Sequence, residues 1–335
     1  MKRYFCWGLI FITSFLYAEL DYVLCVDGGG SKTILQVVDQ EGQLISLTKN
    51  GIESDQVKSV GSNINTVGIE GVRAVLKDLF EGLKIGEQEV SDILHRCRVI
   101  AGMAGVGLPN NRQIVASLFE EWGINKDHIL VISDAELALQ LVDDEGIVLI
   151  SGTGSICLGK KEAKIFRVGG LGRILGDEGS GYQIGFQALK MALAEEYGWG
   201  SPTNLTPVLR EFFHLSDLKS LIPQVNLGEL SPSKIASIAP LVFKKAWEGD
   251  VIAERIIEIA ARELNYLLCK MLEISCLSDC DVHLWGGVFS GTYSDLFINK
   301  MIEQIPGKLH IVNQSHENAA VLFARKFFSL DRRKK

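Results

Sequence analysis

The chain has 335 residues, 47% of them hydrophobic and 22% charged, and its 34 Lys and Arg against 41 Asp and Glu leave a net charge of −7. The length predicts two domains, each large enough for its own core, and the apolar content excludes a disordered chain. The acidic balance argues against binding of nucleic acid or of a membrane surface through basic patches, so we expect no nucleic-acid partner.

The first eighteen residues have the outline of a signal peptide, because Lys2 and Arg3 precede a nearly uncharged apolar run. Ala18 would be the last residue before cleavage, which puts Leu16 at a position where signal peptides have a small residue. A membrane-tethering segment and an early start codon are therefore alternatives. Residues 1–20 are therefore set apart from the fold.

Seven cysteines without zinc or redox spacing favour the cytoplasm. Export or tethering through residues 1–18 is the alternative, and a membrane is a partner only if that segment is retained.

The first half of the chain opens with a strand over 21–27 that ends in Asp27, followed by a tip of glycine and hydroxyl residues. Further strands over 34–39 and 43–48 would complete a meander. The elements that follow alternate between helix and strand. They are a helix over 66–85, a strand over 98–105, a helix over 111–123 and a strand over 129–135.

The same pattern restarts with a strand over 147–150, a second glycine tip over 151–155 and a returning strand over 156–160. The later elements are mostly helical. We expect helices over 181–197, 204–215, 233–247, 250–275 and 317–329, and strands over 281–287 and 308–313. No linker rich in Pro or Ser separates the halves, so the repeat predicts two packed lobes with a ligand cleft between them.

The two glycine tips present backbone N–H groups without Cβ atoms in the way, and such a nest binds phosphate oxygens. For each tip, a simple tight turn is the alternative. Neither tip has the GxxxxGK[ST] spacing of a P-loop. Asp27 could hold Mg²⁺ through water, with turn capping as its alternative, and Lys32 could add positive charge to a transferring phosphoryl group.

Four motifs together resemble those of the BadF/BadG/BcrA/BcrD-type ATPase family, and within it the N-acetylglucosamine kinase branch of the sugar-kinase, Hsp70 and actin superfamily. The motifs are DGGGSKT at 27–33, SGTGS at 151–155, GGLGRILGDEGSG at 169–181 and WGGVFSG at 285–291. The resemblance runs from about residue 21 to 327. It implies an α/β fold of two ribonuclease-H-like, actin-like ATPase lobes, each a mixed five-stranded sheet with flanking helices.

The resemblance also implies the domain limits and the ligands. The N-terminal lobe would span 21–135 with the C-terminal helix 315–330 joined to it, and the C-terminal lobe 136–314 with a helical insert over 190–275. ATP and Mg²⁺ would be the cofactors, an amino sugar the substrate, and a homodimer the assembly. Nucleotide-binding residues would be Gly29, Gly30, Ser31, Lys32, Thr33, Thr153, Gly154, Ala246, Gly286, Gly287 and Ser290, with Asp27 toward Mg²⁺.

The sugar side is implied in the same way. Sugar-binding residues would be Asn63, Asp134, Gly170, Leu171, Gly172 and Asp177. Asp134 ends an apolar strand and opens a helix, so its spacing alone favours an N-cap. The resemblance makes it the catalytic carboxylate that accepts the proton of the attacking hydroxyl.

Two positions depart from the family's pattern. Leu171 stands where the family usually has a tryptophan, and Asn65 where a pocket aromatic can occur. The implied activity is phosphorylation of N-acetylglucosamine or a related hexosamine at O6, with glucosamine and N-acetylmuramate open as substrates.

The alternative function is that of an ATPase that activates a 2-hydroxyacyl-CoA dehydratase or benzoyl-CoA reductase. Cys157 and Cys280 lack the glycine-flanked context of that iron–sulfur cluster. A degenerate sugar sensor is a third hypothesis. We expect Trp122, Trp247 and Trp285 in the core.

Overall fold

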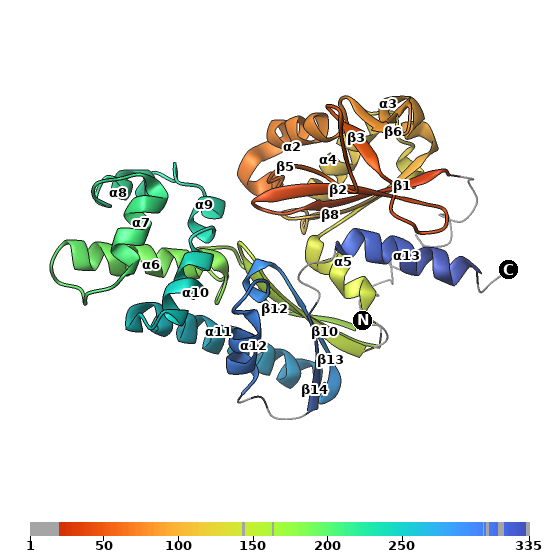
Figure 1. The fold of residues 1–335 in the computed structure, drawn as a ribbon. Helices are drawn as coiled ribbons and strands as arrows, with labels where there is room; N and C mark the ends of the chain where they lie inside the picture. The colour runs from red at the N-terminus through yellow and green to blue at the C-terminus, as the bar shows by residue number, and fades with distance from the viewer. Residues whose placement is uncertain are drawn as a thin grey trace. The chain divides into compact units, whose positions relative to one another are not determined.

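The computed structural model describes residues 20–142, 145–162, 164–303, 305, 308–313 and 318–332 (Figure 1). The signal-like segment 1–18 lies outside the described residues. The chain forms two compact units, one of residues 1–141 with 317–335 and one of residues 142–316. No helix in the described part of the chain combines the length and the apolar character needed to cross a membrane.

The first unit is built on a five-stranded mixed sheet in the order β5-β2-β1-β8-β9. β1 pairs antiparallel with β2 and parallel with β8, and β8 is parallel to β9. The strands are β1 (Tyr22–Gly28), β2 (Lys32–Asp39), β5 (Val57–Val60), β8 (Cys97–Met103) and β9 (Ile129–Ile132). A small second sheet contains β3 (Leu47–Lys49), β4 (Ile52–Ser54), β6 (Leu83–Ile85) and β7 (Gln88–Glu89).

Helices cover both faces of the main sheet. The side chains of β1 point alternately to the two faces, so each face is apolar and packs against helices of its own. Leu24 and Val26 pack with α2 and α4, whereas Val23 and Cys25 pack with α5 and α13. The helices of this unit are α2 (Ile64–Phe80), α3 (Val90–Ile93), α4 (Pro109–Glu120), α5 (Asp134–Leu141) and α13 (Ala319–Arg332), with short 3₁₀ turns at Leu94–Arg96 and Lys126–His128.

The second unit repeats this order as β12-β11-β10-β13-β14. Its strands are β10 (Glu145–Ser151), β11 (Ser155–Lys161), β12 (Lys164–Gly169), β13 (Asp279–Trp285) and β14 (Lys308–Asn313). Its helices are α6 (Gly181–Glu196), α7 (Leu205–Phe213), α8 (Leu221–Asn226), α9 (Pro232–Ala236), α10 (Ala239–Trp247), α11 (Val251–Ser275) and α12 (Ser294–Ile302), with a 3₁₀ turn at Gly287–Phe289. Two five-stranded mixed sheets of one order confirm the predicted fold class.

Three predicted elements were wrong in detail. Residues 43–48 do not form the third strand of the main sheet: Leu44 makes only an isolated bridge to Val38, and β5 pairs with β2 instead. Buried Leu47 directs its segment into the small sheet. The helix predicted over 66–85 ends at Phe80, and the helix predicted over 233–247 is two helices, since Pro240 in the first turn of α10 lacks the N–H that a continuous helix requires.

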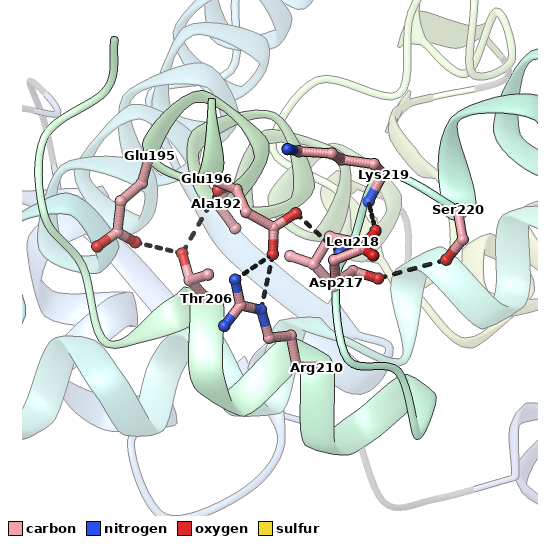
Figure 2. Close-up of polar contacts among 9 residues, drawn as sticks. All are labelled: Ala192, Glu195, Glu196, Thr206, Arg210, Asp217, Leu218, Lys219 and Ser220. Atoms are coloured by element: carbon pink, nitrogen blue, oxygen red, sulfur yellow. Dashed lines mark hydrogen bonds and ion pairs between the residues drawn. The ribbon is translucent and has the colours of Figure 1, made fainter. Parts of the chain in front are cut away.

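A polar network ties the end of α6 to α7 and the loop that follows it (Figure 2). The Glu196 side chain is only 4% exposed, and its Oε1 accepts from Arg210 Nε at 2.6 Å and pairs with Nη2 at 2.5 Å. Its Oε2 accepts from the Leu218 N–H at 2.8 Å. Thr206 donates its hydroxyl to Glu195. The carboxylate of Glu196 therefore joins three segments of the helical region.

Candidate active site

The first glycine tip, Gly29–Ser31, joins β1 to β2 and is held by two neighbouring strand ends. Ser62, just past β5, donates its N–H to the Gly29 carbonyl at 3.1 Å, and the Ala104 N–H past β8 donates to the Gly28 carbonyl at 2.7 Å. The tip rests closely on Gly61, where an added Cβ would lie 2.2 Å from the Gly30 carbonyl oxygen. Any larger residue at 61 would push the tip away, so this contact requires glycine.

Among the tip residues predicted to bind nucleotide, Thr33 has a different position from the rest. Ser31 and Lys32 are exposed, whereas Thr33 is fully buried. Its hydroxyl donates to the Val60 carbonyl at 2.7 Å and lies 2.9 Å from Ser62 Oγ. The Thr33 side chain therefore supports the tip from below.

Asp27 and Asp134 lie at the same edge of the first sheet, where the parallel strands β1, β8 and β9 end. The register pairs Asp27 with Gly102, and Gly102 with Ile132, two residues before Asp134. Burial and the charge of Asp134 raise the pKa of Asp27 to about 6, against the opposing charge of Lys32. Burial also raises the pKa of Asp134, although the Ala135 N–H, 2.9 Å from its Oδ1, opposes that shift. Two carboxyls in one poorly hydrated place hold protons more tightly than exposed ones do.

The helix that begins at Asp134 is capped by Ser133 and not by Asp134. Ser133 Oγ accepts from the Glu136 N–H at 3.1 Å, while Glu136 Oε2 accepts from the Ser133 N–H and hydroxyl, both at 3.0 Å. This reciprocal pattern is a capping box. Arg112 fixes the same Glu136 oxygen through an ion pair at 2.8 Å. The N-cap alternative for Asp134 is therefore wrong, and its carboxylate is left at the strand edge.

Asn63 lies beside the first tip, directly after Ser62. It is the N-cap of α2, and its Oδ1 accepts from the Asn65 N–H at 3.0 Å. Asn111 donates to both the Asn65 side-chain oxygen and the Gly105 carbonyl at 2.9 Å. The capping bond uses the oxygen of the Asn63 amide and does not involve its NH₂ group.

The second glycine tip, Gly152–Gly154, lies on the N-terminus of α6. The Gly181 N–H donates to the Gly152 carbonyl at 2.8 Å, and the Tyr182 N–H donates to the Thr153 carbonyl at 3.3 Å. The flanking Ser155 hydroxyl donates to the Glu178 carbonyl at 2.6 Å. These bonds orient the tip carbonyls toward the helix.

Asp177 contacts this second tip from the loop before α6. Its Oδ1 accepts from the Ser155 N–H at 3.3 Å, and its backbone has φ of 60°. That left-handed conformation is uncommon for a residue other than glycine and fits a position held by its surroundings. Burial raises the pKa of Asp177, and the Ser155 N–H opposes the shift. The adjoining Glu178 has a buried Oε2 for which the described residues provide no hydrogen-bond partner.

The loop of Gly170, Leu171 and Gly172 projects beyond β12. Arg167 donates through Nε to the Gly169 carbonyl at 3.1 Å and through Nη2 to the Gly170 carbonyl. Leu171 is 62% exposed, so it packs little against its own unit. The loop thus presents an apolar side chain on a braced backbone.

The predicted adenosine-side residues follow β13. Gly286 has φ of 101°, and an added Cβ would lie 2.3 Å from the Ser151 carbonyl oxygen, so only glycine fits there. Ser290 donates its hydroxyl to the Gly287 carbonyl at 2.9 Å. Ala246 lies on α10 and packs partly against the core of its unit.

The structure thus groups the predicted residues within each unit. The first brings together Asp27, the first tip, Asn63 and Asp134, and the second joins Thr153 and Gly154 to Asp177. Sequence reasoning missed the supporting residues. They are Gly61, Ser62, Ser133 and Glu136, of which the S-x-x-E spacing of the last two was a usable signal. Trp122 and Trp285 are confirmed as packed, but Trp247 is 63% exposed and its core assignment is wrong, since it ends α10 on the outer side.

The donor set of the first unit fits Mg²⁺. This ion prefers oxygen ligands and is usually held by one or two carboxylates, with waters and substrate phosphates completing its shell. Asp27 offers a carboxylate beside the first tip, close enough to Asp134 to be affected by its charge. No cluster of three or more His, Cys, Asp or Glu side chains suited to a metal occurs in the described ranges. Asp27 would therefore share the ion with phosphate oxygens.

Two sheets of one order, each with a glycine-tipped first hairpin, define a protein of the ribonuclease-H-like, actin-like ATPase class. The chain belongs to the BadF/BadG/BcrA/BcrD ATPase family, whose model matches residues 24–323. This confirms the resemblance drawn from the four motifs.

Similar proteins cover nearly the whole chain. An N-acetylmuramic acid/N-acetylglucosamine kinase of Clostridium acetobutylicum is 33% identical over an alignment 317 positions long, which covers 91% of this chain and 99% of that protein. An N-acetyl-D-glucosamine kinase of Dictyostelium discoideum is 31% identical over 84% of this chain and 90% of its own. The crystal structure of a candidate N-acetylglucosamine kinase from Chromobacterium violaceum superposes with a TM-score of 0.67 at 20% identity, covering 92% of this chain and 99% of that one. At that identity the likeness concerns the fold alone.

Proposed function

We propose that the protein is an ATP-dependent amino-sugar kinase, which transfers the γ-phosphoryl group to O6 of N-acetylglucosamine or a related hexosamine. The observation that carries the proposal is the Asp134 carboxylate, which lies half-buried at the strand edge near Asp27 and is free of the capping role that Ser133 performs. The amino-sugar class is supported by the names of the Clostridium and Dictyostelium relatives.

In the first unit, Asp134 accepts the proton of the sugar hydroxyl as that oxygen forms its bond to the γ-phosphorus. The bond from the γ-phosphorus to the bridging oxygen breaks, and ADP leaves with the electron pair. A raised pKa makes the carboxylate a stronger base than an exposed aspartate. Exposed Ser31 and Lys32 bind phosphate oxygens, and Mg²⁺ held at Asp27 would supply charge neutralisation. The Asn63 amide donates to a sugar hydroxyl.

In the second unit, Thr153 and Gly154 bind phosphate, while Gly286, Gly287, Ser290 and Ala246 bind the adenosine part. Asp177, beside the tip, accepts from a sugar hydroxyl, and the loop of Gly170, Leu171 and Gly172 covers the sugar. Exposed Leu171 replaces the flat contact of a tryptophan with a smaller aliphatic one, which favours a substrate whose substituent fills the extra room.

A coupled ADP-release assay tests the proposal with glucosamine, N-acetylglucosamine, N-acetylmuramate, N-acetylmannosamine and glucose as acceptors. We expect ADP release only with an amino sugar. Asp134→Asn should retain ADP binding and lose at least about a hundredfold in kcat, whereas Asp92→Asn, at an exposed carboxylate of α3, should match the wild type. Sugar-independent hydrolysis, or a brown iron-containing protein, would instead support the partner-activating ATPase. Phosphorus NMR of the product identifies the phosphorylated hydroxyl.

Two further parts of the proposal concern the state of the protein in the cell. We propose a cytoplasmic enzyme, because its nucleotide is there and the cysteines of the described ranges are free. We propose a homodimer on the family resemblance. Light scattering of the purified protein measures the assembly, and a monomer at micromolar concentration would contradict it. The mass of the mature N-terminus in cells reports whether residues 1–18 are removed.

A further inference from the structure

Trp247 is the last residue of α10, and its side chain is 63% exposed. A tryptophan offers a large apolar surface that a folded chain normally covers. Among the described residues of its unit the indole has one ring neighbour, Tyr293, with centroids 5.3 Å apart and planes inclined by 32°. One side of the indole is thus backed by a half-buried ring, and the remaining surface is open.

A row of three aromatic side chains joins the same two segments further into the core. Phe243, one helical turn before Trp247, packs edge-on against Phe297 at 5.2 Å, and Phe297 contacts Phe289 at 6.3 Å. Phe289 belongs to the 3₁₀ turn that begins at Gly287. Phe289 and Phe297 are at most 2% exposed. The row therefore packs α10 against the segment that follows the Gly286–Gly287 loop, and the Trp247–Tyr293 pair joins the same two segments.

No cation from the described part of the chain covers the open face of Trp247. Exposed Tyr197, in the same unit, has Lys219 Nζ 4.7 Å from its ring centroid. None of the cation–ring contacts among the described residues involves Trp247. The lysines just before it pair instead with Glu248, at 2.6 Å from Lys245 and 3.9 Å from Lys244. A neutral flat face is left beside a loop proposed to bind adenosine.

We propose that Trp247, backed by Tyr293, is the stacking surface for the adenine base and gives the enzyme its preference for purine nucleotides. The inference rests on the proposed function for its nucleotide. A purine covers more of an indole face than a pyrimidine does, and stacking of a base on an aromatic ring is worth about a tenfold change in affinity or more. The Tyr293 ring lowers the entropic cost of stacking, because it restrains the indole before the base arrives.

Calorimetric titration with MgADP and MgCDP tests the inference on the full-length protein. Trp247→Ala should raise the Kd for MgADP about tenfold and reduce the preference for MgADP over MgCDP by a similar factor. Trp247→Phe, which keeps a ring, should recover most of the affinity. The matched control is Trp199→Ala, at an indole of the same unit that is 75% exposed and lies outside the proposed site. We expect it to bind as the wild type does.

Steady-state kinetics separates this inference from the proposed function. In an active kinase, Trp247→Ala should raise KM for ATP and leave KM for the amino sugar unchanged. A Kd for MgADP within twofold of wild type in Trp247→Ala, with the fold intact by circular dichroism, would overturn the role of Trp247 while leaving the kinase intact. Wild-type protein that binds MgADP without any sugar-dependent turnover would overturn the kinase and leave the stacking surface in place. Absence of nucleotide binding in the wild type would overturn both.

Discussion

The ion pair between Glu196 and Arg210 gives a quantitative test of what holds the helical region of the second unit together. Arg210→Leu removes both donors from Glu196 Oε1 and leaves a carboxylate whose side chain is 4% exposed with the Leu218 N–H alone. Losing one partner of a fully buried pair costs about 3–5 kcal/mol, and of a surface pair about 0–1 kcal/mol. Arg210 is 39% exposed, so we expect an intermediate loss of about 2 kcal/mol in the free energy of unfolding.

Urea unfolding followed by circular dichroism measures this loss, read from the transition that carries most of the helical signal because the two units need not unfold together. Glu196→Leu and the double variant complete a cycle, in which we expect a coupling free energy of about 2 kcal/mol. The control is Lys270→Leu, because its 2.6 Å bond to Glu273 joins side chains that are 41% and 66% exposed. That change should cost less than about 0.5 kcal/mol. A coupling below about 0.5 kcal/mol between Glu196 and Arg210 would refute the argument from burial.

Three other variants test the supports of the site. Ser133→Ala removes the N-cap and should lower the free energy of unfolding by about 1 kcal/mol; it should also lower kcat more than ADP affinity, because Asp134 lies in the first turn of α5. Thr33→Val keeps the shape but leaves Ser62 without its buried partner, so thermal denaturation should show a loss of about 1–3 kcal/mol, and calorimetry a weaker MgADP affinity. Burial raises the pKa of Glu263 above its ordinary 4.5, so this group makes wild-type stability fall as pH rises from about 4.5 through the folded-state pKa. Glu263→Gln lacks that fall, and its melting temperature relative to wild type should rise between pH 4 and pH 7; equal differences at both pH values would contradict the assignment.

Much of the fold could be predicted because strand and helix periods are local properties of the sequence. The strands β1 and β10 contain the apolar runs 22–26 and 147–150, each with glycine soon after it, and α11 keeps one apolar face over 25 residues. The third strand of the first sheet was missed because pairing partners are chosen by the tertiary structure. Residues 57–60 have the weak pattern VKSV and are selected by bonds such as that of Thr33 to Val60.

The candidate site was predictable only as far as its motifs reach. Glycine tips and strand-end aspartates can be recognised from a few neighbouring residues, whereas the residues that support them are distant in the sequence. Gly61 lies about thirty residues from the tip that it touches, and Arg112 braces Glu136 from another helix. Hydrophobicity alone favours burial of Trp247, but its side chain is 63% exposed at the end of α10.

The last helix packs on the first strand. Ala320, Val321 and Ala324 of α13 are buried against Val23 and Cys25 of β1, although all of the second unit is translated between them. On the ribosome, the second unit has its whole sequence available before the first does. The nascent first unit must wait with the part of its sheet that α13 covers still exposed, and such transiently exposed apolar surface promotes aggregation. A stop codon just before residue 319 would consequently damage the first unit, whose synthesis begins earlier, and leave the sequence of the second unit complete.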